Sequence, residues 1–432
     1  MEIKHGEYNM LDNISFVINT AKNELENIKL LLHSLQKNLD ISTHQILVFI
    51  DSDNQGTYEW LKSVQDDFHD LKIITHSLPP CIGYSRNNNL LVELADNDIV
   101  SYLQSDMVIS PGYDTDILRD LEDNCILSST RVEPPLHGES PQTITKDFGL
   151  DPEQFNFEEW NEYSKTVKED KESTYFFAPI TFYKKVWLDL GGYNTHFRRS
   201  REDSDLVQRC VHKGVKLKQT HNAVVYHFTC TSSRGKDWHN PDNKEAQNRV
   251  ELQKMADMVE LKRFIRKWGT FNHGETKLEK YDVDLCIKNS INFSANFTTQ
   301  LEPVFSRVWV DSDIQELYNI VGKEHDLANL LLGFDEEQWQ EAKKFYNVEN
   351  YEGIFNNLSD FNDDYNIKIE VDASRFTQGD ANVLNSLHAI ISQTEVGDYE
   401  YGNIIFRIKD KKIISSAEMT NPEFDKKLLK IE

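Results

Sequence analysis

One pattern recurs four times between residue 1 and about residue 125: a short apolar run rich in β-branched residues, then turn residues, then a segment with helical spacing. Apolar runs of this kind favour buried strands, and the spacing that follows them favours helices. Strands that alternate with helices form a parallel sheet covered by those helices. The expected strands are Ile14–Ile18, Gln45–Ile50, Leu71–Thr75 and Asp98–Leu103.

The first of the expected helices has the clearest signal. Asn23 is expected to cap it, with Glu26 three residues on. A single apolar stripe follows, made of Leu25, Ile28, Leu31, Leu32 and Leu35. A further helix is expected over Gly83–Leu94.

The alternation breaks down after Cys125, where prolines and an acidic stretch over Glu158–Glu172 predict surface loops and a helix laid over the sheet. Regular patterns return near Tyr175. The expected elements are a strand over Tyr175–Tyr183, helices over Lys184–Leu190 and Asp203–His212, a strand over Ala223–His227 and a helix over Lys244–Trp268.

The polar segment 271–280 is predicted to be a linker between a first domain, 1–270, and a smaller C-terminal α/β domain, 281–432, whose role the sequence does not indicate. In the second domain we expect helices over Ile314–Leu332, Asp335–Phe345 and Asp380–Gln393, with strands over Asn366–Val371 and Gly402–Ile408.

The charge balance limits the partners. Lys and Arg number 47 against 72 Asp and Glu, for a formal charge of -25, so a generally basic surface that coats nucleic acid is excluded. We find no signal peptide and no apolar run of membrane-spanning length, and we expect a soluble cytoplasmic protein. The five scattered cysteines favour reduced thiols over disulfides or a zinc ribbon.

Polar residues follow each predicted strand. In open α/β sheets ligands bind beyond the carboxyl ends of the strands, so these residues are the candidates for a site. They are Asn19, Thr20 and Lys22 after the first strand, Asp51 and Asp53 after the second, Gly83, Ser85 and Arg86 after the third, and Ser105 and Asp106 after the fourth. Neither a dinucleotide-binding glycine motif nor a P-loop is present.

Over roughly residues 12 to 270 the sequence resembles the family 2 glycosyltransferases of the GT-A fold. The resemblance rests on an ordered series of motifs, each of them weak alone, rather than on any single one. They are Phe16–Glu24, Phe49–Thr57, Gly83–Asn89, Tyr102–Asp106, Gly191–Tyr193, Arg201–Leu206, Tyr226–His227 and Phe264–Gly269. The resemblance implies a Rossmann-like, mostly parallel sheet flanked by helices.

The resemblance also implies a donor site. Thr20, Asp51, Asp53, Arg86, Gln104 and Ser105 are expected to contact a nucleotide-sugar, most simply a UDP-sugar, and Asp106 and His227 to hold Mn²⁺ or Mg²⁺ with the donor diphosphate. The family usually has Asp where Gln104 stands, so the metal site loses one carboxylate. Gln104 retains the capacity to hydrogen-bond ribose.

For catalysis the resemblance implies an inverting transfer of the sugar to an acceptor hydroxyl of a glycan or similar molecule. Asp203 is the expected general base, with Glu202 beside it, and Asp205 is the competing candidate. Both Glu202 and Asp203 also suit the N-terminus of a helix for electrostatic reasons alone.

Other interpretations stay open at this stage. Asp106 could be an ordinary turn residue, His227 a core histidine and Arg86 a surface helix residue. The basic cluster near residue 265 suggests a solvated helix face, with contact to a membrane or to the acceptor as the alternative; it comprises Lys262, Arg263, Arg266 and Lys267. The alternative functions are a catalytically inactive nucleotide- or glycan-binding module and a sugar nucleotidyltransferase. The sequence gives neither the donor sugar, the acceptor nor the oligomeric state.

Overall fold

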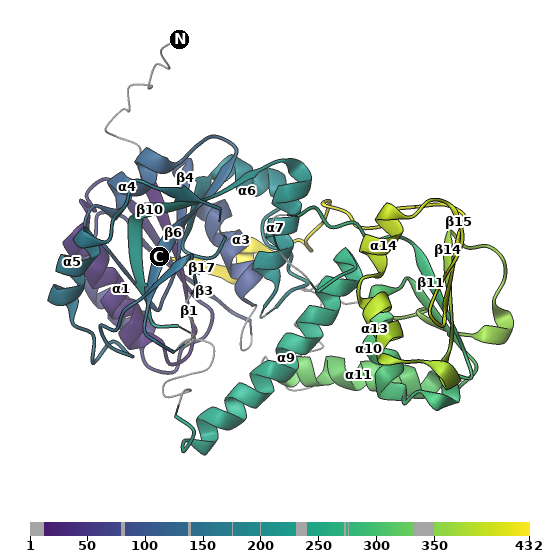
Figure 1. Ribbon diagram of the computed structural model, residues 1–432. Coiled ribbons are helices and arrows are strands. Elements are labelled where there is room, and N and C mark those ends of the chain that lie inside the picture. Colours follow the sequence, from purple (N-terminus) through teal and green to yellow (C-terminus); the bar gives the residue numbers. More distant parts are fainter. Residues whose placement is uncertain are drawn as a thin grey trace, which may run out of the picture. The chain divides into compact units, whose positions relative to one another are not determined.

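The computed structural model describes residues 13–78, 83–136, 140–174, 176–198, 200–229, 240–271, 274, 276–331 and 350–432. The chain divides into two compact units (Figure 1). The first comprises Met1–Tyr193, Lys213–Gln253 and Glu423–Glu432, and the second comprises Asn194–His212 and Lys254–Pro422. These units do not coincide with the predicted boundary at 271–280, and the separate folding of 1–270 and 281–432 stays a prediction.

The first unit is built on a sheet of eleven strands in the order β17-β3-β2-β1-β4-β9-β6-β10-β5, with β7 paired to β6 and β8 to β10. The neighbours β3, β2, β1 and β4 are parallel. The strands are β1 (Ile14–Thr20), β2 (Gln45–Ile50), β3 (Leu71–His76), β4 (Ile99–Gln104), β5 (Met107–Ile109), β6 (Cys125–Glu133), β7 (Thr143–Thr145), β8 (Glu172–Ser173), β9 (Ile180–Tyr183), β10 (Lys216–His227) and β17 (Leu429–Ile431).

Helices flank this sheet. They are α1 (Leu25–Asn38), α2 (Thr57–Val64), α3 (Tyr84–Leu94), α4 (Tyr113–Asp120), α5 (Phe157–Thr166) and α6 (Lys184–Leu190). All six residues of β2 are buried, as expected for a strand covered on both faces. Two further helices, α7 (Glu202–Lys213) and α9 (Lys244–Trp268), contribute residues to both units.

The second unit contains a six-stranded sheet in the order β13-β12-β11-β14-β16-β15. Its strands are β11 (Val283–Lys288), β12 (Arg307–Val310), β13 (Phe355–Asn357), β14 (Ile367–Asp372), β15 (Gly397–Tyr401) and β16 (Ile404–Ile408). Its remaining helices are α10 (Ala295–Leu301), α11 (Ile314–Leu331), α13 (Gln378–Asn385) and α14 (Leu387–Gln393). Alternate residues of β14 and β16 are buried, and they join one apolar core with residues of these helices.

The predicted fold class, an α/β sheet flanked by helices with a smaller C-terminal α/β part, is confirmed. Within the described residues, no helix has both the length and the apolar character that crossing a membrane requires. Cys125, Cys210 and Cys286 are buried free thiols, while Cys81 and Cys230 lie outside the described residues.

Several local predictions were wrong. Asn23 does not cap α1, because it adopts a positive φ of 66° and its backbone N–H bonds to the Oδ1 atom of Asn54. The strand expected from Tyr175 begins only at Ile180, after Pro179, which has no N–H to pair. The helix expected over Asp380–Gln393 is two helices that meet at Ser386. The helix expected over Asp335–Phe345 lies outside the described residues.

The basic residues near the end of α9 are not a solvated face, which corrects a further prediction. Each is at least partly buried and pairs with a carboxylate of the second unit: Lys262 with Glu324, Arg263 with Glu260, Arg266 with Glu302 and Lys267 with Asp205. The end of the predicted linker is packed as well. Lys280 is 2% exposed, and its ammonium group donates to the carbonyls of Arg266, Pro303 and Phe305.

Candidate functional site

The carboxyl ends of β1, β2 and β4 surround a pocket of about 130 Å³ in the first unit. Parallel strands bring their carboxyl ends to one edge of the sheet, which is where such folds bind ligands. Four of the predicted donor contacts line this pocket, namely Thr20, Asp51, Gln104 and Ser105, together with Asn19, another of the candidates at the strand ends. The structure therefore brings together residues from three separate strand ends.

Several side chains that line the pocket have buried polar atoms, among them Asn19, Asn87 and Gln104. Neither side-chain atom of Asn19, nor the Oε1 atom of Gln104, has a hydrogen-bond partner among the described residues. Buried polar groups are nearly always paired, so unpaired ones in a pocket point to a polar ligand. At about 130 Å³ the space is below the roughly 300 Å³ of a typical ligand pocket, so it would enclose only part of a ligand of that size.

Asp51 is held in place by a histidine that the sequence analysis did not single out. The Nε2 atom of His76, at the end of β3, lies 3.2 Å from Oδ1 of Asp51 and 2.7 Å from its carbonyl oxygen. Burial alone would lower the pKa of His76, but its bonds to Asp51 outweigh burial and raise it. His76 therefore keeps its proton, and with it a positive charge beside this carboxylate, to higher pH than a free histidine does.

The remaining two nucleotide candidates lie outside the pocket lining. The carboxylate of Asp53 accepts hydrogen bonds from the backbone N–H groups of Gln55, Gly56 and Tyr58, and so it orders the turn before α2. Arg86 is 5% exposed on α3, which rules out its interpretation as a surface helix residue. A nucleotide contact for either residue stays a prediction.

Strand pairing places the two predicted metal ligands together. β10 runs antiparallel to β5, with His227 opposite Met107, the residue after Asp106. As a result, the Nε2 atom of His227 lies 3.6 Å from Oδ1 of Asp106, and both residues are buried. The other ring nitrogen, Nδ1, lies 2.7 Å from Oε1 of Glu133, at the end of β6. Glu133 thereby holds the ring so that Nε2 faces Asp106.

This arrangement suits a divalent cation. Two donor atoms 3.6 Å apart can share one ion, since metal–oxygen bonds to Mg²⁺ are about 2.1 Å long. A carboxylate on the far side of a histidine is the usual partner of a metal-binding imidazole. Among the described residues, no group of three or more His, Cys, Asp or Glu side chains is arranged to hold an ion.

Glu24 is a second carboxylate close to Asp106, and its role was not predicted. It is 7% exposed, and its Oε2 atom accepts hydrogen bonds from the hydroxyl of Ser105 and the backbone N–H of Ala21. Burial, with a contribution from the charge of Asp106, raises the pKa of Glu24 to about 7. This residue therefore limits the negative charge beside the candidate metal ligands near neutral pH.

Two of the sequence motifs are joined through Asn89. Its side-chain amide bonds to both the N–H and the C=O of Tyr193, at 2.7 and 2.8 Å. Gly192 has a φ of +68°, and a Cβ atom there would lie 2.3 Å from Oδ1 of Asn89. Only glycine fits at this position. The glycine of one motif is therefore needed so that the asparagine of the other can pack against it.

The two predicted catalytic carboxylates, Glu202 and Asp203, belong to the second unit and begin α7. The Oδ1 atom of Asp203 accepts hydrogen bonds from the backbone N–H and hydroxyl of Ser204, at 2.5 and 3.2 Å. The Oε2 atom of Glu202 is buried without a partner among the described residues. Burial and the neighbouring charge of Asp203 raise the pKa of Glu202 well above its usual range, so Glu202 keeps its proton to higher pH.

Asp205, the competing candidate, is a fully buried structural residue. Its carboxylate bonds to Nε of Arg209 at 2.8 Å, Nζ of Lys267 at 2.7 Å and Nε1 of Trp268 at 3.0 Å. Burial alone would raise the pKa of Asp205, but the charges of Lys267 and Arg209 outweigh it and lower the pKa. A carboxylate with these partners has no surface left for a substrate.

Residues 16–188 match the family model described as "Glycosyl transferase family 2". No match was found among curated proteins.

Three solved structures show a weak likeness to this chain. The first is GalNAc-T7 with UDP, GalNAc and Mn²⁺, at 13% identity and TM-score 0.42, with 56% of this chain and 48% of that chain covered. The second is the mannosyltransferase PcManGT from Pyrobaculum calidifontis with GDP-Man and Mn²⁺, at 14% identity and TM-score 0.40, with 59% and 64% covered. The third is TarS 1-349 from S. aureus with UDP, at 14% identity and TM-score 0.38, with 82% and 98% covered. This chain thus spans less than two thirds of the length of the first two.

Proposed function

From the family 2 glycosyltransferase domain that the chain contains, we propose that the protein moves a sugar from a nucleotide diphosphate donor, a UDP-sugar, to an acceptor hydroxyl of a glycan, with inversion at the anomeric carbon. The transfer depends on Mn²⁺ or Mg²⁺ held by Asp106 and His227.

The observation that carries this proposal is the position of Asp106 relative to its neighbours. Ser105 and Gln104, which immediately precede Asp106, line the pocket at the strand ends. The Nε2 atom of His227, at the end of β10, lies 3.6 Å from Oδ1 of Asp106. A polar pocket for the nucleoside therefore adjoins two metal-binding side chains that suit its diphosphate. The chain has a formal charge of -25 and would repel an anionic diphosphate. A cation bound between the protein and the diphosphate offsets this repulsion.

Each residue then has a defined task in the reaction. Thr20, Asp51, Gln104 and Ser105 orient the nucleoside through hydrogen bonds, and Asp53 and Arg86 stay in the proposal as further donor contacts. The cation, when bound, supplies electrostatic stabilisation of the leaving diphosphate. Asp203 takes the proton from the acceptor hydroxyl while the oxygen of that hydroxyl attacks the anomeric carbon of the donor sugar. One displacement of this kind inverts that carbon.

Chelation is expected to weaken nucleotide binding. Titration of UDP by calorimetry with Mn²⁺ and again with excess EDTA should show at least about a tenfold lower affinity after chelation, because the diphosphate loses its bridging ion. Asp106→Ala in Mn²⁺ should behave as the wild type does in EDTA. Equal affinities in the two conditions would remove the metal from the mechanism.

Glu133→Gln is expected to lower Mn²⁺ affinity by about 10- to 100-fold, since an outer carboxylate orients a ligating histidine and raises its basicity. The matched control is Glu162→Gln, because Glu162 is 79% exposed on α5 and pairs only with Lys165 in the described contacts. Mn²⁺ binding followed by electron paramagnetic resonance measures both variants. If the two variants bind Mn²⁺ equally well, Glu133 does not support the metal site.

A further inference from the structure

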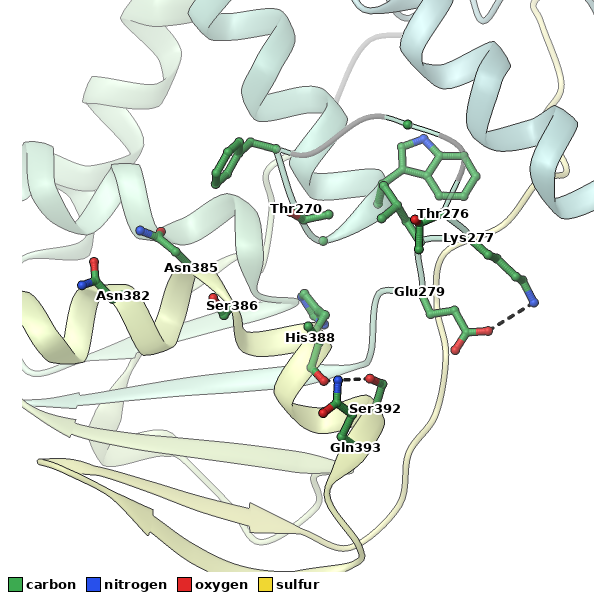
Figure 2. A pocket seen from close by; sticks show the side chains of 16 residues that line it. Thr270, Thr276, Lys277, Glu279, Asn382, Asn385, Ser386, His388, Ser392 and Gln393 are labelled. Atoms are coloured by element: carbon green, nitrogen blue, oxygen red, sulfur yellow. Dashed lines mark hydrogen bonds and ion pairs between the residues drawn. The ribbon is translucent and has the colours of Figure 1, made fainter. Parts of the chain in front are cut away.

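The second unit contains a pocket of about 850 Å³, far larger than the one in the first unit (Figure 2). One wall consists of the end of α9 with the residues after it, Trp268–Phe271, and of described residues from 274 to Glu279. The other wall is the face of α13 and α14 that carries Asn382, Asn385 and Ser386.

The two walls meet where Gly269 contacts His388. Gly269 has a φ of +82°, and a Cβ atom there would lie 2.5 Å from Cδ2 of His388. The His388 ring is fixed at both nitrogens, with Nδ1 accepting from the N–H of Tyr281 at 3.1 Å and Nε2 donating to the carbonyl of Val304 at 2.8 Å. One nitrogen accepts and the other donates, so the imidazole is neutral. Burial lowers its pKa to about 4, in agreement with this tautomer.

Most of the described lining is polar and uncharged. The helical wall presents amides and hydroxyls at Asn382, Asn385, Ser386, Ser392 and Gln393, with Ala389 between them. Among the described lining residues the only charged groups are Lys277 and Glu279, which pair with each other at 3.2 Å. Among these described lining residues, a phosphate or carboxylate ligand would therefore find no unpaired cation, and a cationic ligand no unpaired anion.

An aromatic ring completes this lining. Phe271 is 53% exposed at the pocket, where an unpartnered apolar ring is otherwise unfavourable. A neutral sugar has hydroxyls that both donate to and accept from amides, and an apolar ring face that packs on an aromatic side chain. Concave sites that combine apolar surface with a few convergent polar groups are the usual binding sites for small molecules.

The pocket is braced by the helix that carries the proposed base. Gln208 of α7 is fully buried, donates to the carbonyls of Gly274 and Thr276 at 2.7 and 3.2 Å, and accepts from the N–H of Leu278 at 3.1 Å. One turn earlier, Asp205 fixes the indole of Trp268. Asp203 lies five residues before Gln208, roughly 8 Å along the helix axis. The proposed base and the pocket are thus connected through α7 within the second unit.

We propose that this pocket binds a neutral sugar unit of the glycan acceptor. The acceptor role rests on the proposed transferase function, whereas binding of a neutral sugar rests on the pocket alone.

Binding of defined trisaccharides to the full-length protein tests the proposal. The probes are maltotriose, cellotriose, mannotriose and triacetylchitotriose, with trigalacturonate as the anionic counterpart, each followed by saturation-transfer NMR and calorimetry. At least one neutral trisaccharide should bind. Ala389→Trp, at an exposed helix position, should abolish this binding by filling the pocket, and Asn385→Ala and Phe271→Ala should weaken it by about 3- to 10-fold. Asn319→Ala, an exposed helical asparagine of α11 outside the lining, is the matched control and should bind normally.

UDP titration of the same samples separates this proposal from the proposed function. The proposal is overturned if no neutral trisaccharide binds, if only trigalacturonate binds, or if Ala389→Trp binds as the wild type does, even where UDP affinity is normal. Conversely, trisaccharide binding that Ala389→Trp removes supports the pocket even if UDP fails to bind, and in that case the donor assignment is what fails.

Discussion

Asp203→Asn is expected to lower the rate of sugar transfer by about 10²- to 10⁴-fold, the range that a positioned acid–base group provides. Asparagine nearly preserves the shape of aspartate and keeps an oxygen that can accept the hydrogen bonds from Ser204, but it cannot take the acceptor proton. UDP affinity should be unchanged, because Asp203 belongs to the second unit and the predicted donor residues belong to the first. Single-turnover transfer assays and UDP titration measure the two quantities separately.

Glu316→Gln is the matched control for this experiment, since Glu316 is an exposed carboxylate in the first turn of α11 and should leave the rate unchanged. Glu202→Gln gives the informative comparison. Because the raised pKa of Glu202 keeps it protonated over a wider range, a neutral amide there should cost much less than at Asp203. If Asp203→Asn transfers sugar at the wild-type rate and Glu202→Gln transfers it much more slowly, the general base is Glu202 and not Asp203.

Asp205→Asn is expected to lower the free energy of unfolding by about 3–5 kcal/mol, because it leaves Arg209 and Lys267 as buried cations without their counter-ion. The charge-dependent part of this loss should vanish in acid. The folded-state pKa of Asp205 is depressed, so its contribution is present above the unfolded pKa of about 4 and is lost as the pH falls through the folded value.

Urea denaturation at pH 7 and at pH 3 measures this effect. The surface pair of Lys165 and Glu162 provides the control, since Glu162→Gln should cost no more than about 1 kcal/mol at either pH. If Asp205→Asn also lowers the free energy of unfolding by no more than about 1 kcal/mol, the buried network contributes little to stability.

The same variant also tests the choice of general base. A stable, folded Asp205→Asn protein without transfer activity would restore Asp205 as the candidate base.

Elements defined by local patterns were predicted well from the sequence. The bounds of β2, α6 and α9 match the prediction residue for residue, because a run of apolar residues or a 3.6-residue period is a local signal. The motif series also indicated Asp106 and His227 as neighbours, although 120 residues of chain separate them, and the structure places them 3.6 Å apart.

Residues whose role depends on distant partners were not predictable. Glu133 and His76 end strands and carry no motif, so only the pairing of β6 with β10 and of β2 with β3 reveals their contacts. Glu24 stood inside a motif, but its burial beside Ser105 comes from the packing of α1 against the sheet. The basic residues of α9 looked solvated because their carboxylate partners lie as far as 62 residues away.

The pairing of β17 with β3 has a consequence for how the chain is made. Leu428 bonds to Ser77 across 351 residues of sequence, and Glu432 exchanges backbone hydrogen bonds with Ile73 (Figure 1). A ribosome adding about 5–20 residues per second needs roughly 18–70 s to cover that interval. Throughout this time the nascent first sheet exposes β3 as an open edge, which is the kind of surface on which strands of other chains add. Residues Leu429–Ile431, which are translated long after β3, are therefore the ones that cover this edge, and a nascent chain that stalls before them leaves the ribosome-bound sheet open to aggregation.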